Sequence, residues 1–163
     1  MGGDFQMIRV GQRLPHVELG QIVGDELEVV RLEPLLEGRR VILVGLPGAF
    51  TPLCTGQHLP DLIAHADRLK AAGVHQIFCI APNSPWVVRE WADHADPEGK
   101  LTFLSDGNLA FTRAAGMLAR APEFFLGQCS KRYTMILQHA VVEKLVVEPQ
   151  IGVFNCTRPV FLD

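Results

Sequence analysis

One cysteine of this chain occupies a loop that would make its thiol reactive. Cys54 ends the octapeptide PGAFTPLC (residues 47–54), between an apolar run at 41–46 and a stretch with helical spacing that starts at Thr55. Where a helix begins, unpaired backbone N–H groups and the positive end of the helix dipole converge. Both favour the thiolate, which is the nucleophilic form of cysteine. The alternative is a buried cysteine in an ordinary strand-to-helix turn.

The octapeptide resembles the active-site loop of peroxiredoxins, thiol enzymes that reduce peroxides. Their signature is Pro-x-x-x-Thr/Ser-x-x-Cys, and Pro47, Thr51 and Cys54 match it position for position. The longer match, with HLP at 58–60, is similar to the type 5 (type II) branch, which includes atypical two-cysteine enzymes. The resemblance implies an antioxidant oxidoreductase, a thiol-dependent peroxidase that reduces hydrogen peroxide and organic hydroperoxides. Cys54 would attack the peroxide and become a sulfenic acid.

The same resemblance implies roles for four neighbours of Cys54. Thr51 would hydrogen-bond a peroxide oxygen, and Pro47 would shield the thiolate from water. The backbone N–H groups of Gly48 and Cys54 would hold the negative charge on the leaving oxygen, and Phe50 would form an apolar wall. From the residues alone, Thr51 also fits a helix N-cap and Phe50 also fits core packing.

A second positive charge is needed beside Cys54, because a helix terminus contributes only about 0.3–1 kcal/mol to the stability of an anion. Arg132 lies in the segment SKRYTMI (residues 130–136). This segment is similar to the Lys-Arg-aromatic-Ser/Thr-Met stretch whose arginine lies beside the nucleophile in type 5 peroxiredoxins, so we expect Arg132 to provide the charge. Without that resemblance, an arginine next to a strand is more often a solvated surface charge.

Cys156 follows Pro149 at the spacing found in family members that resolve the sulfenic acid within one chain. The resemblance therefore implies a disulfide between Cys54 and Cys156, which thioredoxin or glutaredoxin would reduce as the external donor. The next three residues, at 157–159, depart from the family pattern. One alternative is a one-cysteine peroxidase that is recycled by glutathione or glutaredoxin. Another is a redox-sensing binding protein that uses Cys54 to signal.

Other residues with reactive side chains are expected to have lesser roles. Cys79 lies in an apolar strand and should be an inert core residue. Cys129 is a spare thiol, a glutathionylation site or a residue without a role. His58 lies four residues after Cys54, and two ligands make a weak metal site, so helix packing is the better interpretation. We expect no metal, haem or flavin cofactor.

Composition is that of an ordinary globular domain, which we take to span residues 1–163. Apolar residues make up 48% of the chain and charged residues 20%. The net charge of -3 and the pI of about 6.1, without a basic cluster, argue against nucleic acid or an anionic membrane as a partner. No secretory signal is visible, and scattered cysteines without a C-x-x-C pair suit a cytoplasmic protein. An organellar location is the alternative if a targeting peptide was removed.

Strands that alternate with helices predict an α/β domain with a mixed central sheet flanked by helices. We expect strands at 17–19, 27–30, 41–46, 74–81, 101–104, 133–138 and 141–148, helices at 55–72, 84–95 and 109–115, and a helical turn at 32–36. Pro60 should interrupt the first long helix, and residues 117–130 give no clear pattern. The peroxiredoxin resemblance implies a thioredoxin-like fold. It also implies a homodimer whose contact lies near residues 117–128 and the loops around Cys54.

Overall fold

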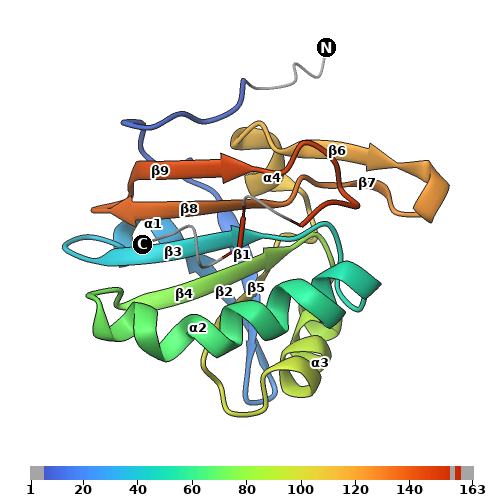
Figure 1. Ribbon diagram of the computed structural model, residues 1–163, viewed down its shortest axis with the longest axis horizontal. Coiled ribbons are helices and arrows are strands. Elements are labelled where there is room, and N and C mark those ends of the chain that lie inside the picture. Colours follow the sequence, from blue (N-terminus) through green and yellow to red (C-terminus); the bar gives the residue numbers. More distant parts are fainter. Residues whose placement is uncertain (1–5, 155–156, 159–163) are drawn as a thin grey trace.

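A seven-stranded mixed sheet forms the centre of the computed structural model, which describes residues 6–154 and 157–158 (Figure 1). The strands follow the order β2-β1-β5-β4-β3-β8-β9. Neighbours β3 and β4 are parallel, as are β4 and β5, and the remaining pairs are antiparallel. The strands are β1 (Glu18–Val23), β2 (Glu26–Arg31), β3 (Arg40–Gly45), β4 (Gln76–Ala81), β5 (Thr102–Ser105), β8 (Tyr133–Gln138) and β9 (Val141–Val147).

Helices cover both faces of this sheet, because alternate residues of its buried strands point to opposite sides. On one face, α2 (Leu59–Ala71) and α3 (Pro85–Ala95) pack against residues such as Ile42 of β3 and Ile77 of β4 (Figure 1). On the other face, α1 (Leu32–Leu35) and α4 (Ala110–Ala114) share a second apolar cluster with the strand residues in between. The predicted α/β architecture with a mixed sheet is therefore confirmed. Within the described ranges, no helix is long and apolar enough to cross a membrane.

Residues 117–130, for which the sequence pattern made no prediction, form a separate hairpin. Strands β6 (Leu118–Ala121) and β7 (Gly127–Ser130) are antiparallel and are joined through a short 3-10 helix, η2 (Pro122–Phe124). Figure 1 shows this hairpin projecting from one end of the central sheet. Phe125 at its tip has a positive φ of 56° and is 97% exposed.

Two local features of the sequence act as expected. Ser84 caps α3 by accepting a hydrogen bond from the backbone N–H of Val87. The expected hairpin between β8 and β9 is present and turns through His139 and Ala140, which have positive φ values of 53° and 63°. Such a two-residue loop is a type I′ turn, although it lacks the usual Asn-Gly.

The end of β3 and the start of β8 meet at a glycine. Gly45 pairs with Tyr133, and a Cβ atom on Gly45 would lie only 2.0 Å from Cε1 of the fully buried Tyr133 ring. Only glycine leaves room for this ring. The pairing places the loop that follows β3 beside Arg132, which precedes β8.

Candidate active site

The loop that carries the octapeptide is held by the neighbouring parallel strand. Leu46 N–H donates to the carbonyl of Ile80 at 3.0 Å, and Ala49 N–H donates to Oδ1 of Asn83, just after β4, at 2.9 Å. Pro47 and Gly48 are buried. Phe50 has a positive φ of 61° and is 50% exposed, so its core-packing interpretation is wrong. Carboxyl ends of parallel strands meet at one edge of a sheet, and this loop starts from that edge.

Cys54 lies at the start of a π-helical segment, η1 (Cys54–His58), which leads directly into α2. The backbone N–H of Leu59 donates to the carbonyl of Cys54, as the wider π turn requires. In a regular α-helix, Pro60 would have no N–H for the carbonyl four residues earlier, and its ring would clash with that carbonyl. The interruption predicted at Pro60 is therefore present, as this π segment.

The thiol of Cys54 is fully buried, and the helix start around it is fixed from two sides. Thr55 N–H donates to the carbonyl of Thr51 at 2.9 Å, and its hydroxyl accepts from Nε1 of the buried Trp91 at 3.0 Å. Trp91 belongs to α3, so the second helix of this face holds the turn that presents Cys54.

Thr51 is oriented by the loop itself. Its hydroxyl donates to the carbonyl of Gly48 at 2.9 Å. A hydroxyl has one hydrogen and two lone pairs, so Oγ1 of Thr51 can still accept a hydrogen bond from a peroxide O–H. A Cβ atom on Gly48 would lie 3.2 Å from Cγ2 of Thr51 and 3.5 Å from Cδ2 of Leu126, so the loop also approaches the β6–β7 hairpin closely.

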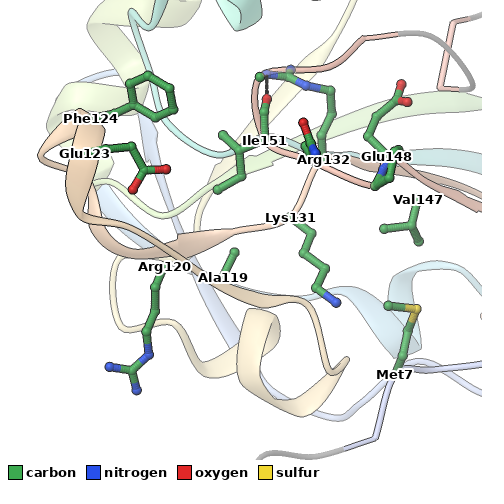
Figure 2. A pocket seen from close by; sticks show the side chains of 13 residues that line it. Met7, Ala119, Arg120, Glu123, Phe124, Lys131, Arg132, Val147, Glu148 and Ile151 are labelled. Carbon is green, nitrogen blue, oxygen red and sulfur yellow. Dashed lines mark hydrogen bonds between the residues drawn. The ribbon is translucent and has the colours of Figure 1, made fainter.

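Arg132 is 2% exposed and is tied to the helix that carries Cys54. Its Nη1 lies 2.9 Å from Nδ1 of His58, four residues after Cys54. Its Nη2 donates to the carbonyl of Ile151 at 3.3 Å (Figure 2). The interpretation of Arg132 as a solvated surface charge is therefore wrong, and the structure brings its guanidinium to the same helix as Cys54.

His58 is a buried packing residue, as expected, but the sequence reasoning missed its contact with Arg132. Its ring is buried and stacks on Phe154 of the C-terminal segment, with ring centroids 4.4 Å apart and planes at 28°. Burial lowers the pKa of His58 to about 3, and the positive charge of Arg132 acts in the same direction against a smaller opposing effect of Glu148. The sequence signal for placing His58 near this site was its spacing from Cys54, since residues four apart share one side of a helix.

Two other cysteines, Cys79 and Cys129, are buried, and only Cys129 interacts electrostatically with Cys54 among the described residues. Cys79 on β4 is buried, and burial raises the pKa of its thiol strongly, as expected for an inert core residue. Burial also raises the pKa of Cys129 on β7, and the negative charges of Glu123 and of the Cys54 thiolate add to this effect. Cys129 is therefore within electrostatic reach of Cys54. Cys156 lies outside the described residues.

Together these groups make a candidate site for attack by a thiolate. A buried thiol begins a helix, a buried guanidinium is held beside the same helix, and the hydroxyl of Thr51, three residues before the thiol, donates within the loop and can still accept. Cations and helix termini stabilise a thiolate against a thiol. Within the described ranges, no three His, Cys, Asp or Glu residues are grouped to hold a metal ion.

Sequence comparison identifies the family. The redoxin family model matches residues 9–158. The chain is 37% identical to Peroxiredoxin-2C of Oryza sativa subsp. japonica over 142 residues, which cover 86% of this chain and 88% of the relative. The chain belongs to the peroxiredoxin family. This peroxiredoxin is also 37% identical to Peroxiredoxin sll1621 of Synechocystis sp., over 89% of its own length and 80% of the relative's.

Solved structures of relatives agree with this assignment. Reduced Prx3 from Vibrio vulnificus in complex with hydrogen peroxide matches this peroxiredoxin with a TM-score of 0.89 and 35% identity, over 96% of this chain and 94% of that one. Oxidized Prx3 from the same organism matches over 87% and 89% of the two chains, with a TM-score of 0.80 and 37% identity. The fold of this peroxiredoxin is thioredoxin-like, and its activity is that of a thiol-dependent peroxidase.

Proposed function

We propose that this peroxiredoxin reduces hydrogen peroxide and small organic hydroperoxides with Cys54 as its nucleophile. The observation that supports this most directly is the link from Arg132 through His58 to the helix of Cys54, at 2.9 Å and fully buried. In the first step the Cys54 thiolate forms a bond to one peroxide oxygen, and the O–O bond breaks. The other oxygen takes a proton and leaves as water or alcohol, and Cys54 becomes a sulfenic acid.

Neighbouring groups would orient the peroxide for this attack. Thr51 accepts a hydrogen bond from the peroxide O–H, because its own proton is directed to the carbonyl of Gly48. The N–H groups of Gly48 and Cys54, with Arg132, stabilise the charge that develops on the leaving oxygen. Pro47, which is buried, and Phe50, which is half exposed, would keep water away from the thiolate.

A groove lies beside Arg132, and none of its lining residues belongs to the octapeptide loop 47–54. It has a volume of about 610 Å³ and lies between the β6–β7 hairpin and residues 147–152. Figure 2 shows Phe124 and Glu123 on one side of it, and Val147 and Glu148 on the other. Its lining combines apolar residues, among them Met7 and Ile151, with charged ones such as Arg120 and Lys131.

Cys156 would then resolve the sulfenic acid within the same chain. Its thiol would attack the Cys54 sulfenic acid, forming a disulfide and releasing water, and thioredoxin or glutaredoxin would reduce that disulfide. The support is the path of the flanking residues. Phe154 stacks on His58, and Thr157 donates from its N–H and its hydroxyl to the buried Glu148 at 3.0 and 2.6 Å.

Peroxide consumption with different donors tests this cycle. With thioredoxin or glutaredoxin present, we expect many equivalents of peroxide to be consumed, whereas a redox sensor would stop after one. In the absence of donor, mass spectrometry of peroxide-treated protein should show a Cys54–Cys156 disulfide within one chain. The Cys156→Ser variant should oxidise equally fast but accumulate sulfinic acid at Cys54, and Cys129→Ser should behave like the parent. A mixed disulfide of Cys54 with glutathione or with Cys129 would instead support the one-cysteine mechanism.

We also propose that this peroxiredoxin is a homodimer. Three phenylalanines on the octapeptide loop and the β6–β7 hairpin are exposed: Phe50 by 50%, Phe124 by 59% and Phe125 by 97%. Gly48 approaches Leu126, so the loop and the hairpin adjoin one another. Exposed aromatic side chains on adjoining segments are typical of a protein contact, and a second copy of the chain would bury them.

A further inference from the structure

The contact between His58 and Arg132 can have only one arrangement of protons. A guanidinium has donors and no acceptor, so Nη1 of Arg132 must donate to Nδ1 of His58, 2.9 Å away. Nδ1 therefore carries a lone pair, and the ring proton is on Nε2. His58 is a neutral imidazole in this contact, in agreement with its complete burial beside a positive charge.

The ring of His58 is fixed by its surroundings rather than by a second hydrogen bond. Its Nε2 is buried and has no hydrogen-bond partner among the described residues. One side of the ring stacks on Phe154, and the backbone of His58 belongs to the π segment that begins at Cys54. The lone pair of Nδ1 is thus held at a set place relative to Cys54.

Arg132 in turn is held at both of its amino groups. Nη1 donates to His58, and Nη2 donates to the carbonyl of Ile151 at 3.3 Å (Figure 2). Its Nε is buried without a partner in the described part of the chain. The side chain has many rotamers to lose on ordering, and the shorter of these two contacts is the one to His58.

We propose that His58 is a positioning residue for the peroxidase reaction, and that its neutral ring holds the Arg132 guanidinium in place beside Cys54. This inference rests on the proposed roles of Cys54 and Arg132. In this role the imidazole is a positioning group and not a reacting one. It acts through Arg132, by accepting one hydrogen bond that no other described side chain accepts from Nη1.

Two substitutions of His58 test this role, one that keeps an aromatic ring without the hydrogen-bond acceptor and one that keeps an acceptor without the ring. His58→Phe retains the stacking on Phe154 but loses the acceptor, and it should slow oxidation of Cys54 by peroxide roughly ten- to hundredfold. His58→Asn places an amide oxygen near the position of Nδ1 and should restore most of the rate. His65→Phe, on the same helix but outside this contact, is the matched control and should oxidise like the parent.

A double-mutant cycle then distinguishes positioning from a merely structural role. Because His58 acts through Arg132, adding His58→Phe to Arg132→Met should slow oxidation little further. The inference would be overturned if His58→Phe slowed Cys54 oxidation by the same factor in the parent and in Arg132→Met. It would also be overturned if His58→Phe alone left the rate unchanged. Either result would leave the proposed function intact. If Arg132→Met itself oxidised at the parent rate, the proposed roles of both residues would be wrong.

Discussion

Arg132 is the residue at which the active-site helix, the central sheet and the C-terminal segment meet. It precedes β8, donates to His58 on the helix of Cys54, and donates to the carbonyl of Ile151. A buried guanidinium needs such partners, because an unpaired buried charge is very costly. The same contacts fix a positive charge against the helix segment that begins at Cys54.

Replacing Arg132 tests whether its charge acts on Cys54. Arg132→Met should lower the thiolate fraction at neutral pH and slow the first oxidation sharply, since the site loses its cation. Arg132→Lys should recover only part of the rate, because an ammonium cannot donate to His58 and Ile151 with the same planar geometry. Thiolate absorbance, followed as a function of pH, is the measurement. Identical curves for Arg132→Met and the parent would contradict the electrostatic role.

His58 should make the fold sensitive to acid. Its pKa is about 3 in the folded protein and about 6.5 in an unfolded chain, so below about pH 6.5 the unfolded state binds a proton that the folded state excludes. The contribution of neutral His58 to the free energy of unfolding is therefore fully present above that pH. It falls by up to about 1.4 kcal/mol for each pH unit below it. The facing charges are those of Arg132, which adds to the effect, and Glu148, which opposes it.

Urea unfolding of the parent and of His58→Phe, at about pH 7 and about pH 5, measures this contribution. The parent should lose about 2 kcal/mol more than His58→Phe between the two conditions. All other titrating groups are common to both proteins and cancel in the difference. Equal losses would show that His58 accepts a proton in the folded state.

Motif matching predicted which loop residues lie together at the candidate site but not the contacts that Arg132 makes there. Pro47, Thr51 and Cys54 lie within one loop, so their spacing in the sequence predicts their proximity. Arg132 was predicted only by its resemblance to a family segment, because a strand-flanking arginine has no local signal. The partner of Arg132, His58, could not be predicted, since that contact spans 74 residues of sequence.

At the scale of elements, the junction of β3 and β8 positions both halves of the site. Gly45→Ala should destabilise the protein by about 1–3 kcal/mol, because the added methyl group would lie 2.0 Å from the Tyr133 ring, which is buried and cannot move away. Urea denaturation measures this change. Gly56→Ala is the control, since a Cβ atom there has nothing within 4 Å and alanine favours helix. A Gly45→Ala protein as stable as the parent would contradict the close packing at this junction.

Elements with strong periodicity were predicted from the sequence, and those without it were not. Buried strands such as β3 and β4 are continuous apolar runs, and α3 begins with a clear Ser-Pro signal. The β6–β7 hairpin has short strands with mixed polar and apolar residues, so no period is visible. Leu126 in this hairpin lies close to Gly48 of the octapeptide loop, a proximity between distant segments that no local pattern predicts.

At the scale of the whole molecule, the exposed phenylalanines predict self-association. Phe125→Asp should shift the protein from dimer to monomer in sedimentation velocity, because a carboxylate would be buried in the contact. The fold should tolerate the change, since aspartate is among the residues that accept the positive φ of 56° found there. Trp86→Asp, at an exposed aromatic residue on α3, is the control. A parent protein that is monomeric at all concentrations, or a Phe125→Asp protein that remains dimeric, would contradict the proposed contact.

The mixed sheet and its two helical layers could be expected from the alternation of strands and helices along the chain. Strand order could not, because residues far apart in sequence decide it: β5 lies between β1 and β4, and β8 lies next to β3. That order brings Arg132 back beside the loop that follows β3.

The most direct test of the whole account is the rate of peroxide consumption by Cys54→Ser, measured beside Cys79→Ser with a thioredoxin or glutaredoxin donor present. A serine hydroxyl is not ionised at neutral pH and is a poor nucleophile without a general base. We therefore expect Cys54→Ser to consume no peroxide, while Cys79→Ser, altered at a buried strand residue, consumes it at the parent rate. Substantial consumption by a folded Cys54→Ser protein would contradict the assignment of Cys54 as the nucleophile.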